Sequence, residues 1–133
     1  MIVVDTNLIL YFYMNGAHSR SAEKAFAKDP QWTAPLLWRS EFRNVLATCL
    51  RRSAMDFETA VSIQDEAERL MDGSEFSVPS TDVLRIAAGS GCSAYDCEFV
   101  ALARYLEVPL VTADRALLRA FPDTAVHPDA FGR

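Results

Sequence analysis

Two aspartates follow the apolar runs of this sequence that are expected to form strands. Asp5 comes directly after the β-branched run Ile2–Val4, and Asp114 comes just after the run that ends at Thr112. Burying a carboxylate next to a strand removes its hydration, and this costs free energy unless another group compensates the charge. Asp114 is also placed to cap the following helix, so it has a purely structural interpretation as well. Both residues are candidates for chemistry at the end of a sheet.

Two further acids interrupt the apolar faces of expected helices. Glu41 shares a helix face with Leu37 and Val45, and Asp96 shares one with Phe99. A single acid on an apolar stripe is more often hydrogen-bonded than catalytic. The other helix glutamates have polar neighbours at helical spacing and are interpreted as solvated surface: Glu23, Glu58, Glu66, Glu68 and Glu98.

Four acids that converge on one end of a sheet would need compensation for their charge. Two carboxylates about 5 Å apart repel by roughly 3 kcal/mol at an effective dielectric constant of about 20. A site built from oxygen ligands, without histidine or thiolate, favours Mg²⁺ or Mn²⁺. Such an ion activates water and neutralises charge in phosphodiester hydrolysis. His18 and His127 lie far apart, and no Ser-His-Asp or HExxH spacing is present.

Length and composition indicate one folded domain over residues 1–133. Half of the residues are hydrophobic and 23% are charged, which is ordinary for a globular protein. The longest apolar run, residues 8–14, is too short for a membrane helix, and no secretory signal is visible. We therefore expect a cytoplasmic protein without a membrane segment. The three cysteines predict neither a disulfide framework nor a zinc site.

The hydrophobic periodicity predicts alternating strands and helices. Strands are expected at residues 2–4, 31–34, 75–78 and 109–112, with a weak fifth at 124–127. Helices are expected after Asn7 to near Asn15 and at residues 21–28, 35–52, 57–71, 80–88, 95–106 and 115–121, with Asp56 and Ser80 as caps. Residues 89–93 read as the most flexible segment. This alternation predicts an α/β domain with three α/β/α layers and a central parallel sheet of four to five strands. In such sheets ligands bind beyond the carboxyl ends of the strands.

Four segments of the chain, in order, resemble the acidic motifs of the PIN-domain ribonucleases. They are residues 1–7, 38–46, 95–103 and 110–115, which hold Asp5, Glu41, Asp96 and Asp114 respectively. Their order and spacing, and the total length, resemble the VapC-type toxins of bacterial and archaeal toxin–antitoxin pairs. The resemblance covers nearly the whole chain. One departure is Cys97, where the family commonly has a smaller residue after its third acid.

The resemblance implies an Mg²⁺- or Mn²⁺-dependent endoribonuclease that acts on single-stranded or loop RNA. The four acids would be the catalytic metal ligands, and Thr6, Asn7 and Thr112 would support them by hydrogen bonding. The family also implies a homodimer. Its toxins are silenced by an antitoxin whose C-terminal segment enters the groove of the active site.

The net charge of −5 counts against RNA binding by the whole surface. A local basic rim is the alternative, with Arg39, Arg43 and Arg115 as possible RNA contacts because they lie near the proposed acids in sequence. They also fit a solvated helix face. The aromatic residues are interpreted mainly as core or dimer interface, with base stacking as the alternative: Tyr11, Phe12, Tyr13, Trp32 and Trp38.

Two other functions are compatible with parts of the pattern. Asp5 could act as an aspartyl nucleophile in phosphoryl transfer, but many such enzymes have a second Asp two positions later, where this chain has Asn7. No plausible catalytic lysine is apparent either. The chain could also be a catalytically silent RNA-binding or regulatory module. A complete set of four mutually repelling acids is hard to explain in a silent module.

Overall fold

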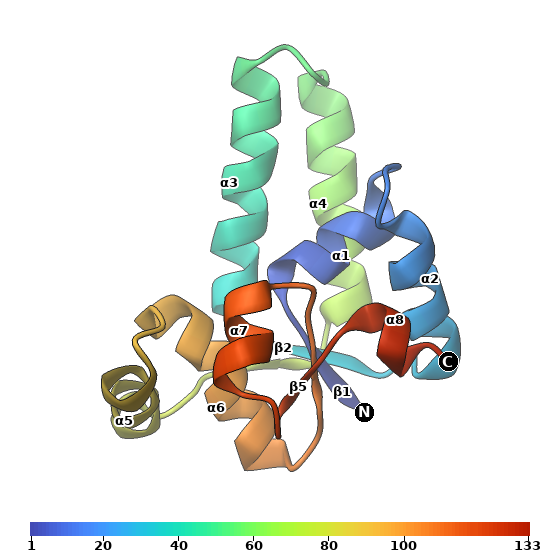
Figure 1. Ribbon diagram of the computed structural model, residues 1–133. Helices are drawn as coiled ribbons and strands as arrows, with labels where there is room; N and C mark the ends of the chain where they lie inside the picture. Colours follow the sequence, from blue (N-terminus) through green and yellow to red (C-terminus); the bar gives the residue numbers. More distant parts are fainter.

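The centre of the molecule is a five-stranded parallel sheet, seen in the computed structural model of residues 1–133 (Figure 1). Its strands are β1 (Ile2–Val4), β2 (Trp32–Pro35), β3 (Glu75–Phe76), β4 (Leu110–Val111) and β5 (Ala125–Val126). The strand order is β3-β2-β1-β4-β5, and every neighbouring pair is parallel. The predicted parallel α/β fold is therefore confirmed, with five strands.

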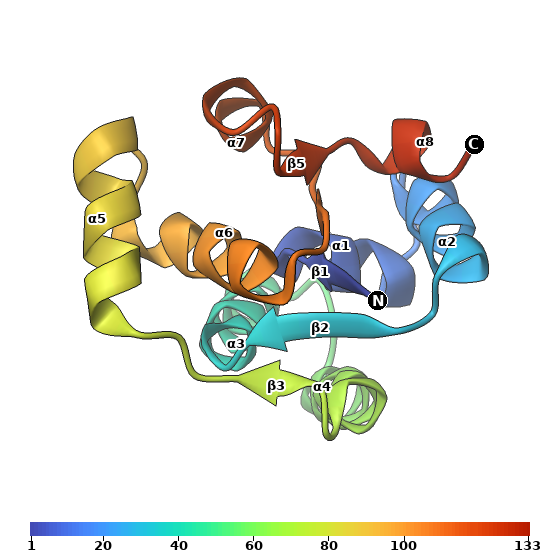
Figure 2. The ribbon, with the colours of Figure 1, turned by 90° about the horizontal axis from the view of Figure 1, so that it is seen from below.

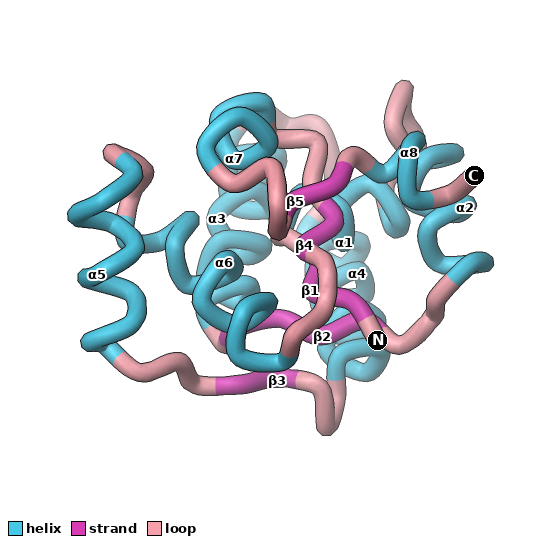
Figure 3. Tube along the Cα trace, turned by 60° about the horizontal axis from the view of Figure 1, so that its bottom comes forward, coloured by secondary structure: helices cyan, strands magenta, loops and turns pink.

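Helices cover both faces of the sheet. They are α1 (Thr6–Tyr13), α2 (Ser19–Lys28), α3 (Leu37–Arg51), α4 (Phe57–Met71), α5 (Ser80–Ser90), α6 (Ala94–Leu106), α7 (Arg115–Ala120) and α8 (Pro128–Phe131). Helix α6 packs against β1, β2 and β4, and α5 packs on α6. Helices α3 and α4 pack on β2 and form, with α1, the opposite layer. Figure 3 shows β1, β2, β4 and β5 in the middle of the molecule with helices around them, and β3 at the edge.

The core explains why the central strands hold their place. Ile2, Val3 and Val4 are buried, as β-branched residues in a strand covered on both faces must be. Trp38 and Phe42 of α3 are fully buried and meet edge to face, with ring centroids 5.5 Å apart. The side of α3 that holds these rings fixes the helix against the sheet, which in turn fixes where its other residues point.

Strand order reverses beside β1. The chain runs outward from β1 to β2 and β3, then returns to form β4 and β5 on the other side of β1 (Figure 2). Val3 pairs with Thr33 on one side and with Leu110 on the other. In open parallel sheets, the carboxyl ends of the strands at such a reversal form the usual ligand-binding crevice. Asp5 and Asp114 follow the two strands that meet there.

Several local predictions were wrong. Pro35 belongs to β2 rather than to the first turn of α3, because pairing continues to β3 and Leu36 N–H donates to the Phe76 carbonyl at 3.0 Å. Ser80 opens α5 without a side-chain cap.

Residues 89–93, which were predicted to be the most flexible segment, join α5 to α6. Gly89 and Ser90 form the last turn of α5, and Gly91 ends that helix in the left-handed conformation. The short helix α8 was not predicted. The structure contains no helix long and apolar enough to cross a membrane.

Candidate active site at the carboxyl ends of the strands

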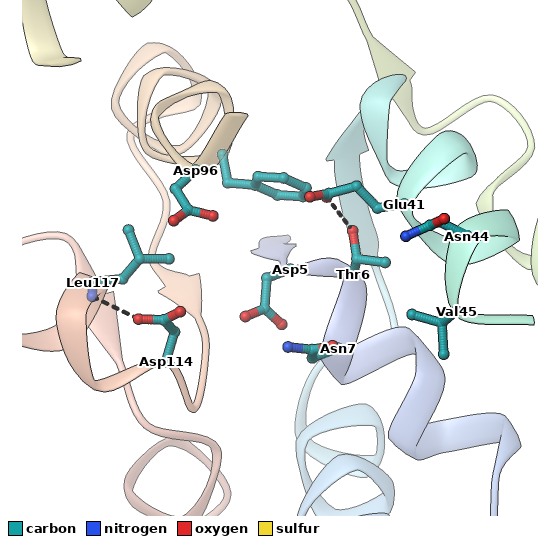
Figure 4. Close-up of a pocket in the computed structure, with 10 residues that line it drawn as sticks. Asp5, Thr6, Asn7, Glu41, Asn44, Val45, Asp96, Asp114 and Leu117 are labelled. Atoms are coloured by element: carbon teal, nitrogen blue, oxygen red, sulfur yellow. Dashed lines mark hydrogen bonds between the residues drawn. The ribbon is translucent and has the colours of Figure 1, made fainter. Parts of the chain in front are cut away.

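Four acidic side chains from four separate parts of the chain line one pocket. They are Asp5, Glu41, Asp96 and Asp114. The pocket has a volume of about 220 Å³, and Figure 4 shows the carboxylates facing a common space. Its other lining residues are Thr6, Asn7, Asn44, Val45, Phe99 and Leu117. No lysine or arginine is among the lining residues, so the chain brings no cation to this pocket.

Asp5 stands at the start of α1 and is almost completely buried, with 8% of its surface exposed. One carboxylate oxygen caps the helix by accepting the Leu8 N–H at 2.9 Å, and the other accepts the hydroxyl of Thr112. Burial raises the pKa of Asp5 to about 6, and the charges of Asp114 and Glu41 add to the rise. The two hydrogen bonds oppose this shift by favouring the ionised form.

Glu41 faces the pocket from the first half of α3. The Thr6 hydroxyl donates to its Oε1 at 2.7 Å (Figure 4), so α1 orients an acid of α3. Burial raises the pKa of Glu41, the Thr6 hydrogen bond lowers it, and the charge of Asp96 raises it further. Asn44 stands one helical turn after Glu41 and lines the same pocket. Asn44 was not among the predicted site residues, although its spacing of three positions from Glu41 was a usable signal.

Asp96 and Asp114 lie at the N-terminal ends of two helices. Asp96 lies in the first turn of α6, where the Ser93 hydroxyl accepts its N–H at 3.1 Å. Burial raises the pKa of Asp96, and the charge of Asp114 adds to the rise. Asp114 caps α7 by accepting the Leu117 N–H at 3.0 Å. The capping interpretation of Asp114 and its place in the pocket are therefore both correct.

Thr112 connects two of the acids. Its hydroxyl donates to Asp5 and accepts the N–H of Asp114 at 3.0 Å, and its side chain is fully buried. Thr6 performs the comparable task for Glu41. Asn7, the third residue predicted to support the acids, is exposed and forms no side-chain hydrogen bond to a carboxylate. It lies at the rim of the pocket instead.

Each of the four carboxylates repels two of the others. The charges of Asp114 and Glu41 raise the pKa of Asp5. The charge of Asp96 raises the pKa of Glu41, and the charge of Asp114 raises the pKa of Asp96. Glu98 lies outside the lining of the pocket but is half-buried, and burial, followed by the charge of Glu41, raises its pKa. The interpretation of Glu98 as solvated surface is therefore only partly right, because the residue is partly shielded from water and lies within electrostatic reach of Glu41. An array of this kind must bind protons or a cation.

The donor chemistry of the pocket fits a hard divalent cation. Carboxylate, hydroxyl and amide oxygens are the groups that Mg²⁺ and Mn²⁺ prefer. No three Asp, Glu, His or Cys side chains lie close enough together to enclose an ion by themselves. Mg²⁺ is usually held by one or two carboxylates together with water and substrate phosphate. Two adjacent acids of the pocket, such as Asp5 and Asp114, would hold it in this way.

The arginines near the acids in sequence do not line the pocket. Arg39 forms ion pairs with Glu75 at 2.5 Å and Glu68 at 2.8 Å, so its guanidinium is already engaged. Arg43 and Arg115 are exposed. Of these three residues, Arg43 and Arg115 therefore remain candidates for contact with a polyanion outside the pocket, and Arg39 has a structural role.

The fold and the site together define a small parallel α/β protein with an acidic pocket at its topological switch point. The PIN domain family matches residues 2–122, and the chain belongs to this family, as its motifs predicted. No curated protein sequence gives a significant match.

Three solved structures support the same fold. PAE2754 from Pyrobaculum aerophilum has a TM-score of 0.79 and 20% identity, over 98% of this chain and 92% of that one. FitAcB from Neisseria gonorrhoeae has a TM-score of 0.73 and 16% identity, over 96% and 98%. A toxin–antitoxin complex from Klebsiella pneumoniae has a TM-score of 0.66 and 15% identity, also over 96% and 98%.

Proposed function

We propose that this protein is an Mg²⁺- or Mn²⁺-dependent endoribonuclease that hydrolyses RNA phosphodiester bonds in the cytoplasm. One observation carries the proposal: four carboxylates, drawn from the ends of two strands and from two helices, line a single pocket without a positively charged residue. No positively charged side chain of the pocket neutralises these carboxylates. An ion that neutralises them also attracts the phosphate of a nucleic acid.

The acids of the site have different proposed roles. Asp5 is held by the Leu8 N–H and the Thr112 hydroxyl, so its carboxylate is oriented before any ligand arrives. Asp5 and Asp114 would hold the cation, which would supply charge neutralisation and activation of water in phosphodiester hydrolysis. Glu41 and Asp96 have raised pKa values, which suit them to accept a proton from water.

An aspartyl nucleophile is disfavoured by the same geometry. Both oxygens of Asp5 accept hydrogen bonds, and only 8% of the residue is exposed. Attack on phosphorus needs a carboxylate oxygen that a bulky phosphoryl group can approach closely, and the burial of Asp5 restricts that approach. A small cation needs less room, and a carboxylate oxygen that accepts one hydrogen bond keeps a second lone pair for it. Asp5 therefore serves better as an oriented ligand than as an attacking group.

We further propose that the protein is the toxin of a toxin–antitoxin pair and acts as a homodimer. The support for the toxin role is the fold, which is shared over nearly the whole length with a chain of the Klebsiella pneumoniae toxin–antitoxin complex and with FitAcB. The homodimer is proposed from the family resemblance. The cognate antitoxin would silence the enzyme by closing access to the acidic pocket. Co-expression of the protein with the product of a neighbouring small reading frame tests this role, since an antitoxin restores growth and co-purifies with the toxin.

Cleavage of total RNA tests the proposed activity. The protein is incubated with RNA and Mn²⁺ or Mg²⁺, with and without a chelator, and the new RNA ends are mapped. We expect discrete cuts that the chelator abolishes and that Asp96→Asn eliminates, while binding of RNA persists. Asp65→Asn removes an exposed charge of α4 outside the acidic pocket and is the matched control, with unchanged cleavage. Binding without cleavage by the unmodified protein would instead identify a catalytically silent RNA-binding module.

A further inference from the structure

A second pocket adjoins the acidic one. It has a volume of about 330 Å³ and lies between α1 and the segment that leads into α2. Asn7 and Val45 line both pockets, so the two form neighbouring parts of one surface depression. The second pocket is lined by no aspartate or glutamate. A polyanion held at the first pocket thus meets no additional repulsion in the second.

An aromatic pair forms part of the wall of this second pocket. The rings of Tyr11 and His18 are stacked, with centroids 4.6 Å apart and planes inclined by 28°. Tyr11 is half-buried and His18 is exposed, so the stack begins on the body of the protein and ends in solvent. Proteins bind unpaired RNA bases by stacking them on aromatic rings, histidine included.

Amide groups complement the aromatic wall. Asn7 and Asn15 are both exposed and line the pocket. An asparagine amide carries two donors and an acceptor, which matches the mixed donors and acceptors on the edge of a base. The rest of the lining is largely apolar, with Leu10 and Met14 among its members. The pocket thus offers a stacking surface, an apolar floor and a polar rim.

The aromatic wall also lies at a useful distance from the acids. Asp5 caps α1 and Tyr11 belongs to the same helix, six residues further on, which is about 9 Å along the helix axis. Burial, and after it the charge of Asp5, raises the pKa of Tyr11, so the phenol lies within the electrostatic reach of the acidic pocket. A nucleotide whose phosphate lies among the carboxylates can therefore place its base against the stack.

We propose that the Tyr11–His18 pocket binds the nucleobase next to the phosphate that is cleaved, with the base stacked on the His18 ring. The inference rests on the proposed ribonuclease function and adds a determinant of substrate choice to it. His18 is a binding residue in this account. The carboxylates perform the reaction, and the pocket selects which unpaired base is seated beside it.

The variant His18→Ala removes the outer ring of the stack with little effect on the fold. His18 is exposed and precedes α2 without a side-chain capping hydrogen bond, so the helix loses no cap. His18→Phe keeps an aromatic ring at the same place. Tyr105→Ala is the matched control, because Tyr105 is 72% exposed and lies nine residues beyond Asp96, about 14 Å along α6.

The first measurement is cleavage of a single-stranded RNA that contains one mapped cut. We expect His18→Ala to lower kcat/KM about tenfold, the effect of losing one base–aromatic stack, and to relax the base preference at one position beside the cut. His18→Phe keeps most of the activity and Tyr105→Ala keeps all of it. Equal activity and equal base preference in His18→Ala and Tyr105→Ala would overturn the proposal.

The second measurement does not depend on cleavage. Short oligoribonucleotides that carry 2-aminopurine at successive positions are titrated with the protein in the Asp5→Asn background, which keeps the RNA intact. Stacking on the pocket quenches the fluorescence at one position, and adding His18→Ala abolishes this quenching. If no RNA is ever cut but the quenching depends on His18, the proposed activity fails and the base pocket stands. If RNA is cut but neither measurement depends on His18, the base pocket fails and the activity stands.

Discussion

At the level of single residues, Asp5 carries the clearest electrostatic cost. Its carboxylate is buried beside two other acids, and its pKa is raised from 3.8 to about 6. A carboxyl group whose pKa is higher in the folded than in the unfolded protein destabilises the fold when it ionises. This cost is absent below about pH 4 and is fully present above about pH 6. The fold remains stable despite this cost, and the buried position orients the Asp5 carboxylate for the proposed role as a metal ligand.

Asp5→Asn relieves this cost, and its effect on stability depends on pH. In metal-free protein at about pH 8, we expect the free energy of unfolding to rise by up to about 3 kcal/mol. The gain fades as pH falls towards about 4, where the wild-type carboxyl is protonated as well. Urea unfolding at both pH values measures it, with Asp65→Asn as the unshifted control. A gain that is equal at both pH values would contradict the assigned cause.

Thr112 offers a second test at this level. Thr112→Val keeps the shape of the side chain but removes the hydroxyl shared by Asp5 and the Asp114 N–H. We expect a loss of about 1–3 kcal/mol in the free energy of unfolding and a fall in RNA cleavage. Thr112→Ser keeps the hydroxyl and retains most of both. If Val and Ser variants cleave RNA equally, the hydroxyl does not position the acids.

The sequence was informative about some of these residues and silent about others. Asp5 and Asp114 were found because they follow apolar strands, and Glu41 because it interrupts an apolar stripe. Glu98 was not found, because only the fold brings it within electrostatic reach of Glu41, which lies 57 positions earlier in the sequence. The ion pairs of Arg39 were missed for the same reason, since Glu68 and Glu75 reach it from other elements.

At the level of elements, the joint between α5 and α6 sets the place of Asp96. Gly91 ends α5 with a φ of 73°, a conformation that costs little only for glycine. Ser93 then caps α6 and lies three residues before Asp96. This joint was predicted as a flexible glycine-rich segment. The glycine and serine content suggested flexibility, but in the structure Gly91 ends α5 and Ser93 caps α6.

The two glycines of this joint are predicted to respond in opposite ways to alanine. Gly89→Ala adds a methyl group in open space on a helix, so we expect a gain of about 0.5–1 kcal/mol. Gly91→Ala forces a left-handed conformation on alanine and costs about 1–2 kcal/mol. Thermal unfolding of both variants tests this contrast. Destabilisation of the same size in both would show that α5 ends before Gly89.

Element positions were predicted well where periodicity was strong and less well at the boundaries. The long helices α3, α4 and α6 show clear apolar faces, and the structure places them within two residues of the expected ranges. Pro35 was assigned to the wrong element because its pairing with Phe76 is a tertiary contact. Helix α8 was not predicted because a segment of four residues is too short to show hydrophobic periodicity. Pro128, directly after His127, was nevertheless a usable signal for the start of a helix.

At the level of the whole molecule, the fold concentrates negative charge at one end of the sheet. The acids come from segments up to 109 positions apart in sequence, Asp5 and Asp114, and β1 and β4 bring them together. A net charge of −5 makes this protein a poor general binder of RNA. Recognition of RNA must then come from a local site, in which a bound cation reverses the sign of the field.

Metal-dependent thermal stability tests the central claim most directly, because it needs neither the RNA target nor a partner protein. A ligand present at about 100-fold above its dissociation constant stabilises the fold by about 2.7 kcal/mol, which corresponds to a rise in Tm of roughly 10 °C for a chain of this size. We predict such a rise for the wild-type protein in millimolar Mn²⁺ relative to chelator, a similar rise for Asp65→Asn, and little or none for Asp5→Asn. A wild-type Tm that is the same in Mn²⁺ and in chelator would contradict the account.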